Sequence, residues 1–213
     1  MTQRAGSIRS YGSTALLVET DSAVTAVALR ARLDAQPPRG VIETMPGLHT
    51  VLVRFDPAVT DAERLAAAVS SIEIDPDDLG AAAAEVQDEV SVRVDYSGAD
   101  LADVAEHSGL TVEQVIDAHQ ARSYRVLFIG MAPGFYFLAG GDPRLNPPRR
   151  SSPRTSVPKG AVGLAGELTG IYPRSGPGGW QLIGTVVDDL WDPTRLPAAL
   201  LAPGTSVRFT STG

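Results

Sequence analysis

Glycine and proline are concentrated in the last part of this 213-residue chain. Residues 130–213 hold 25 of them, whereas residues 1–129 hold 12. Because both residue types interrupt helices and favour turns, the last 84 residues are limited to short strands joined by tight turns. Many short strands with dense turns indicate a closed barrel or a sandwich.

The first part of the chain instead alternates strands with helices. Residues 15–19, 41–45 and 50–55 are expected strands. The segment Met45–Leu48 lies between the last two and has proline second and glycine third, which is typical of a type II turn and predicts a hairpin.

Two helices are expected around these strands. The first follows a cap at Asp21 or Ser22 and has apolar positions at Val24, Val27, Ala28 and Ala31. The second begins at a capping box of Thr60 and Glu63 and packs through Leu65, Val69 and Ile72. The order βαββα is one strand short of a ferredoxin-like unit.

A domain boundary is expected near residue 88. Residues 74–88 are acidic and rich in alanine, which is typical of a linker, and residues 90–96 alternate apolar and polar side chains as a strand does. That strand could close the first unit or open the second, and we favour the second. We therefore predict an α+β protein, with a ferredoxin-like α/β domain and its linker at 1–88 and a barrel domain at 89–213.

Two short helices are expected next. Asp100 caps the first and Gly109 ends it, and Thr111 with Gln114 caps the second. His119 then falls on the buried face of the second helix, where it is either a hydrogen-bonded core histidine or a functional base. A strand at residues 124–129 follows.

Composition excludes several classes of protein. The chain has no cysteine, so it has no disulfide or thiolate site, and a cytoplasmic location follows. The net charge of -7 argues against nucleic acid as a partner, and no apolar segment is long enough to predict a membrane span. The sequence contains no Walker A loop, no nucleophile elbow and no zinc-site spacing, so no metal site, ATP site or nucleophile is evident in this chain.

Three unusual strings remain as candidate sites. Residues 130–138 read GMAPGFYFL, and one of their three adjacent rings is expected to face a cleft or a partner. Residues 147–154 read PPRRSSPR, in which prolines hold arginines in place for an anion, although a solvated loop is the alternative. Residues 170–180 contain GIYP and PGGW, where glycines allow close approach to a ligand or simply form a turn beside a core tryptophan.

Together these strings resemble the family of the B subunit of the bacterial ATP-dependent 5-oxoprolinase. The family is also called allophanate hydrolase subunit 1, and it includes the sporulation kinase inhibitor KipI. The resemblance covers most of residues 90–213 and is carried by GMAPGFYFL, by PRR-x-x-PR-x-x-VP-x-G and by GIYP followed by PGGW. It implies a cyclophilin-like β-barrel after a small α/β domain.

The resemblance also implies partners and a reaction. It implies a cyclophilin-like C subunit, a TIM-barrel A subunit, and ATP with Mg²⁺ used by the complex to open 5-oxoproline to glutamate, with this chain inert alone. The alternatives are a role in allophanate or urea degradation and a KipI-like inhibitor of a histidine kinase. His119 is the candidate base, and the candidate substrate-binding residues are Gly134, Phe135, Arg149, Arg150, Arg154, Tyr172, Gly178, Gly179 and Trp180.

Overall fold

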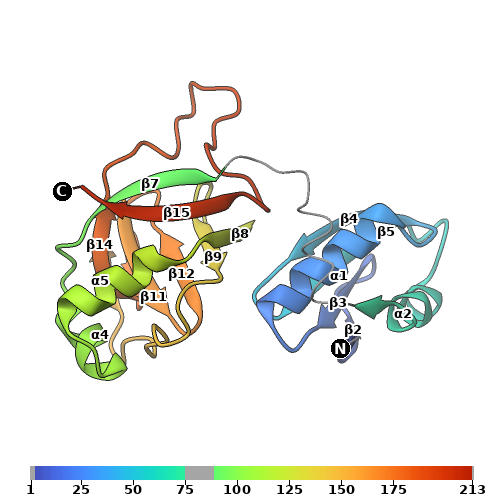
Figure 1. Ribbon diagram of the computed structural model, residues 1–213. Coiled ribbons are helices and arrows are strands. Elements are labelled where there is room, and N and C mark those ends of the chain that lie inside the picture. The colour runs from blue at the N-terminus through green and yellow to red at the C-terminus, as the bar shows by residue number, and fades with distance from the viewer. Residues whose placement is uncertain (1–2, 75–88, 213) are drawn as a thin grey trace. The chain divides into compact units, whose positions relative to one another are not determined.

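The computed structural model describes residues 3–74 and 89–212. The chain divides into two compact units, Met1–Val86 and Gln87–Gly213, each with its own hydrophobic core (Figure 1). Most of the predicted linker at 74–88 lies outside the described residues. Among the helices of the described ranges, none is both long and apolar enough to cross a membrane.

The first unit is a four-stranded antiparallel sheet with two helices. Its sheet has the order β2-β3-β5-β4, and a separate pair joins β1 to β6. In chain order the elements are β1 (Gln3–Arg4), β2 (Ile8–Ser10), β3 (Ala15–Glu19), α1 (Ala23–Ala35), β4 (Val41–Pro46), β5 (Thr50–Phe55), α2 (Ala62–Ser70) and β6 (Glu73–Ile74).

The predicted βαββα order is present, but the edge of the sheet differs from a ferredoxin-like unit. In a ferredoxin-like unit, the strand that follows the second helix lies beside the strand that precedes the first helix, which is β3 in this chain. Here β2 takes that place, with Ile8 opposite Val18, while β6 pairs with β1. Residues before position 15 carry no strong alternation, so this N-terminal strand was not predicted from the sequence.

Local details of the first unit correct three predictions. Pro46 belongs to β4, and Gly47 donates its N–H to the Thr50 carbonyl (2.6 Å) without a positive φ, so the type II turn is wrong. Asp61, and not Thr60, caps α2. The buried face of α1 also differs from the predicted set, because its larger side chains determine which face packs against the sheet: it consists of Ala23, Thr25, Ala26, Ala28, Leu29 and Leu33.

The second unit contains a closed seven-stranded barrel, which is one of the two alternatives, barrel or sandwich, that the turn density indicated. The strand order is β11-β12-β9-β8-β15-β7-β14, in which β15 and β7 are parallel and the other described pairs are antiparallel. In chain order, the elements of the whole second unit are β7 (Val90–Asp95), α4 (Leu101–Ser108), α5 (Val112–Ala121), β8 (Tyr124–Ile129), β9 (Tyr136–Ala139), β10 (Arg154–Val157), β11 (Ala161–Ala165), β12 (Leu168–Ile171), β13 (Gly176–Gly178), β14 (Gln181–Val186) and β15 (Ser206–Ser211).

The helices of this unit begin and end largely where the sequence predicted. The Thr111 and Gln114 side chains form a complete capping box at α5, and Gly109 ends α4 with a φ of 65°. β7 buries Val92 and Val94, and it opens the barrel instead of closing the first unit.

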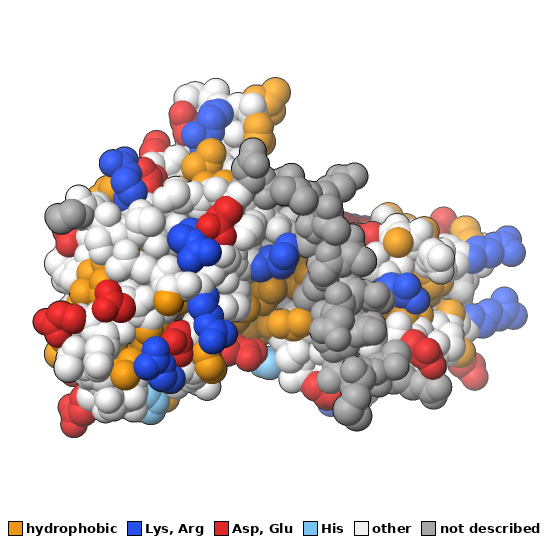
Figure 2. Space-filling view, viewed as in Figure 1, with side chains coloured by type: hydrophobic (Ala, Val, Ile, Leu, Met, Phe, Trp, Pro, Cys, Tyr) orange, Lys and Arg blue, Asp and Glu red, His pale blue; other side chains and the backbone are white. Residues whose placement is uncertain are grey.

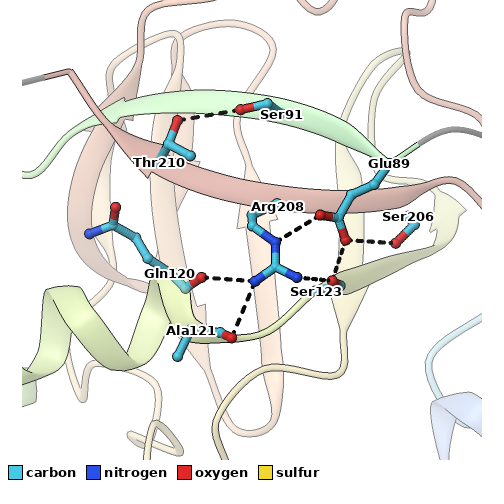
Figure 3. Close-up of polar contacts among 8 residues, drawn as sticks. All are labelled: Glu89, Ser91, Gln120, Ala121, Ser123, Ser206, Arg208 and Thr210. Carbon is cyan, nitrogen blue, oxygen red and sulfur yellow. Dashed lines mark hydrogen bonds and ion pairs between the residues drawn. The ribbon is translucent and has the colours of Figure 1, made fainter.

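Arg208 on β15 ties the barrel to the end of α5 (Figure 3). Its guanidinium donates to the carbonyls of Gln120 and Ala121 at 3.4 and 3.2 Å, which places a cation at the negative end of the helix. The same group donates to Ser123 Oγ (2.8 Å) and Glu89 (2.7 Å), and these contacts hold the pKa of Glu89 below its usual value. This network has a structural role, because its donors and acceptors are satisfied by one another and by the helix end.

Candidate functional site

The predicted GMAPGF string forms a tight loop between β8 and β9. Gly130 donates its N–H to the Phe135 carbonyl (3.1 Å), and Met131 has a φ of 62°. Gly134 has a φ of 78°, and a Cβ at this position would lie 3.0 Å from the ring of Trp191. Glycine is therefore needed at 134 both for its conformation and for the close approach of Trp191.

The three adjacent rings after this loop are all buried. Tyr136 points into the barrel core, whereas Phe135 and Phe137 contact each other and Trp180, with ring centroids 4.8 to 6.1 Å apart. The prediction that one of the three rings faces a cleft or a partner holds for the cleft, because Phe135 lines a groove, whereas Tyr136 and Phe137 pack inside the unit. This groove lies at the surface beside the loop, and Phe135 forms part of its wall.

Tyr172, from the GIYP string, stands between two surface hollows. The larger is a groove of about 340 Å³ and the smaller a cavity of about 30 Å³, and both include Tyr172 and Pro173 in their walls. Other walls of the groove are Met131, Ala132, Phe135, Arg174, Ser175, Gly176 and Pro177. Other walls of the cavity include Gly134, Tyr136, Lys159, Asp189, Leu190 and Trp191. Two of the predicted strings thus meet at Tyr172.

The hydroxyl of Tyr172 interacts electrostatically with Arg149 and Arg154, two of the three arginines predicted to bind substrate. Burial raises the pKa of Tyr172, and the backbone of Trp180 and the positive charges of Arg149 and Arg154 partly offset this rise. At neutral pH the hydroxyl therefore stays protonated and is a hydrogen-bond donor. The Tyr172 ring packs edge-on against Phe135 at 4.8 Å.

Two of the three predicted arginines share one buried carboxylate. Arg154 donates two hydrogen bonds to Asp100, at 2.7 and 2.8 Å, and Arg150 donates a third at 2.6 Å. The Asp100 side chain is 1% exposed, and it also accepts the N–H of Leu182 at 2.7 Å. These contacts anchor the segment at 147–154 to the start of α4 and to β14.

This role of Asp100 corrects the prediction that its side chain caps α4. It occupies the N-cap position but makes no capping hydrogen bond. Burial alone would raise the pKa of Asp100, but the bonds from Arg154 and Leu182 and the charge of Arg150 outweigh it, so the pKa lies below its usual value. The carboxylate therefore stays charged at neutral pH and holds both guanidinium groups.

Arg149 is held differently from its two neighbours. Its guanidinium lies 6.0 Å from the centre of the Trp180 ring and makes no ion pair within the described residues. The side chain is exposed. Of the three predicted arginines, it is the one whose hydrogen-bond donors are not already used by Asp100.

The PGGW string lies directly against the arginine segment. Arg150 donates its backbone N–H to the Gly179 carbonyl (2.8 Å), and β10 pairs with β13 so that Arg154 stands opposite Gly178. A side chain at Gly178 would collide with the Tyr172 hydroxyl. Trp180 is 4% exposed and is a core tryptophan, as one predicted alternative held. The structure thus gathers Phe135, Tyr172, Gly178, Gly179, Trp180 and the three arginines into one region, which we call the Tyr172 site.

His119 lies apart from the Tyr172 site. Its ring is fully buried, stacks on Phe209 at 4.5 Å, and shares a hydrogen bond with the Tyr96 hydroxyl at Nδ1 (2.7 Å). Burial lowers the pKa of His119 to about 3, so the ring is neutral. Such a packed ring does not reach a substrate, and the core-histidine alternative describes it better than the predicted role of base.

A pH dependence of stability follows from this burial. Because the pKa of His119 is about 3 when folded and 6.5 when unfolded, its contribution is complete above pH 6.5 and is lost as the pH falls toward 3. We expect His119 to contribute a loss of up to about 1.4 kcal/mol per pH unit below pH ~6. Urea denaturation at pH 7, 6 and 5 should show a shallower slope for His119→Phe, whereas the exposed control His107→Phe keeps the wild-type slope. Equal slopes for all three proteins would contradict this prediction.

Metal ions in proteins are usually held by several His, Cys, Asp or Glu side chains together. Among residues 3–74 and 89–212, no three His, Cys, Asp or Glu side chains gather where they could hold a metal ion. Lys159, at the mouth of the small cavity, lies 3.5 Å from Asp189, and both side chains are two-thirds exposed.

Comparison with known proteins places this geometry in a family. Residues 6–201 match the family described as carboxyltransferase domain, subdomain C and D. The chain belongs to this family. Among its relatives is the 5-oxoprolinase B subunit of Escherichia coli O157:H7, which is 38% identical over 208 residues, covering 93% of this chain and 92% of that protein. The resemblance to the B subunit of 5-oxoprolinase is therefore confirmed.

Solved structures share the fold of the family. TTHA0988 is 34% identical with a TM-score of 0.71, and the match covers 97% of this chain but 41% of that longer chain. Urea carboxylase of Kluyveromyces lactis is 18% identical with a TM-score of 0.70, covering 100% of this chain and 23% of the enzyme, and at this identity the likeness concerns the fold alone. The predicted α+β class, a small α/β domain followed by a cyclophilin-like β-barrel, is confirmed.

Proposed function

We propose that this chain is the B subunit of an ATP-dependent 5-oxoprolinase and forms part of its site together with the C subunit. The observation that carries the proposal is the meeting of the three family strings at Tyr172, in a chain aligned with the E. coli B subunit over almost its whole length. A TIM-barrel A subunit completes the proposed complex, which acts in the cytoplasm.

The Tyr172 site suits an anionic, lactam-containing substrate. Opening the ring of 5-oxoproline breaks its C–N bond, adds water and develops negative charge on the carbonyl oxygen, while the substrate carboxylate stays ionised. Arg149 and the protonated Tyr172 hydroxyl are donors for such charges. The aromatic wall of Phe135 and Trp180 keeps this region apolar, which strengthens those interactions.

We assign ATP and Mg²⁺ to the complex as a whole, and among the described residues of this chain no three His, Cys, Asp or Glu side chains gather where they could hold a metal ion. The chain supplies charge recognition at one wall of a shared site and is inert alone.

Turnover by the reconstituted complex tests the proposal. The A and C subunits with this chain, ATP and Mg²⁺ should release glutamate and phosphate from 5-oxoproline but should not process allophanate or urea. Turnover of allophanate or urea in place of 5-oxoproline would favour the alternative family activity. Inhibition of a histidine kinase by a chain that supports no turnover would favour the KipI-like role.

A further inference from the structure

One loop of the second unit carries three of its strongly exposed large hydrophobic side chains. Val187, Leu196 and Leu200 are 50%, 98% and 46% exposed, and all lie between β14 and β15. This segment rises from the barrel beyond β7 and β15 (Figure 1). Hydrophobic side chains stand on the same projection in Figure 2. We call residues 190–200 the finger.

The finger is a short hairpin with a fixed shape. Leu200 donates its N–H to the Leu190 carbonyl and Asp192 donates to the Ala198 carbonyl, both at 2.9 Å, and Trp191 pairs with Ala199. Its base is attached to the barrel, because the Tyr136 hydroxyl also donates to the Leu190 carbonyl (2.9 Å). A loop built in this way loses little conformational entropy when it binds.

The polar groups at the tip are satisfied within the finger. The Asp192 carboxylate accepts the N–H and hydroxyl of Thr194 at 2.8 and 2.6 Å. The Arg195 guanidinium donates to the carbonyls of Pro197 and Ala198, at 3.3 Å each. Leu196 is 98% exposed at this tip, beside polar side chains that already hydrogen-bond within the finger.

We propose that the finger docks this chain onto its partner in the complex, with Leu196 entering an apolar pocket of that partner. The identification of the partner as the C subunit rests on the proposed function. The C subunit is the expected occupant because Leu190 and Trp191, at the base of the finger, line the cavity that includes Tyr172, where the proposed function places the wall shared with that subunit. Such an anchor, one apolar side chain in a pocket, is typical of the centre of a protein interface.

The position of the finger links docking to the site. Leu190 and Trp191, at its base, line the small cavity that shares Tyr172 with the groove, and the Trp191 ring lies against Gly134. A protein docked on the finger would thus lie next to the cavity and the exposed Met131 of the neighbouring loop. The partner would complete the walls of a site that this chain leaves open.

Measured affinity for the C subunit, without substrate, tests the finger. Leu196→Asp should weaken binding by about tenfold or more, while the melting temperature stays unchanged because the side chain is 98% exposed. Leu196→Met should bind nearly as the wild type does. The matched control is Ile42→Asp, which places the same charge at a 59% exposed apolar position of the first unit and should bind normally.

The outcomes separate this proposal from the proposed function. Wild-type affinity of Leu196→Asp, or an equal loss in Ile42→Asp, would overturn the docking role of the finger. A complex whose assembly depends on Leu196 but which does not turn over 5-oxoproline would contradict the proposed function and support the docking role of the finger. Failure of the wild-type chain to bind the C subunit would contradict both.

Discussion

Replacing Asp100 by asparagine should lower the free energy of unfolding by about 3 kcal/mol. The carboxylate is 1% exposed and accepts three hydrogen bonds from Arg150 and Arg154 and one from the N–H of Leu182. Asparagine keeps the shape but removes the charge, so two guanidinium groups lose their counter-ion. Urea denaturation at pH 7 measures the effect.

Asp103→Asn is the matched control for this change. Asp103 lies in the first turn of α4, just after Asp100, but is exposed, so removing its charge should change the free energy of unfolding by only about a few tenths of a kcal/mol. Because the pKa of Asp100 lies below the usual 3.8, its contribution is complete above pH 3.8 and is lost in stronger acid. A stability of Asp100→Asn equal to that of Asp103→Asn would show that the buried network does not anchor the arginine segment.

Arg149→Ala should reduce turnover by the assembled complex by more than tenfold without loss of stability. The side chain is exposed beside Trp180 and donates no hydrogen bond to Asp100, so its removal should leave the fold intact. Loss of a charge that binds an anion in a desolvated site costs about 2 to 5 kcal/mol. Arg149→Lys should restore little activity, because a lysine ammonium does not reproduce the planar, bidentate hydrogen bonding of a guanidinium.

The three arginines should therefore differ in what their removal changes. Arg150→Ala and Arg154→Ala are expected to lower stability, since each removes a partner of buried Asp100. Arg122→Ala, an exposed cation elsewhere in the same unit, is the control and should leave both activity and stability unchanged. Normal turnover by Arg149→Ala at wild-type stability would show that this residue belongs to a solvated loop.

Much of the fold was predictable because local signals and tertiary structure agree. The Thr111–Gln114 capping box, the Gly109 helix end and the alternation of Val92 and Val94 each depend on neighbouring residues, and each was found as expected. The density of glycine and proline predicted a barrel or a sandwich, and the family resemblance implied the barrel that the structure contains. The edge strand β2 was missed because its pairing with β3 joins residues that carry no local pattern.

The sequence motifs of the site could be found from the sequence, but their arrangement in space could not. Sequence order separates Phe135, Tyr172 and Trp180, and the barrel register alone brings their rings together. Asp100 was assigned to a helix cap because its partners lie 50 and 54 residues away. A cluster of arginines with no nearby acid was the one signal that could have pointed to a distant buried carboxylate. The finger was not predicted, because it contains no sequence motif and because leucines in a sequence are usually expected in the core.

The most direct test of the account is whether this chain is required by, and insufficient for, 5-oxoproline turnover. Glutamate and phosphate release is measured with ATP and Mg²⁺ for the chain alone, for the A and C subunits without it, and for all three together. We predict turnover in the full mixture and none in the other two. Turnover by the chain alone, or full turnover by the A and C subunits in its absence, would contradict the proposal that it forms one wall of a shared site.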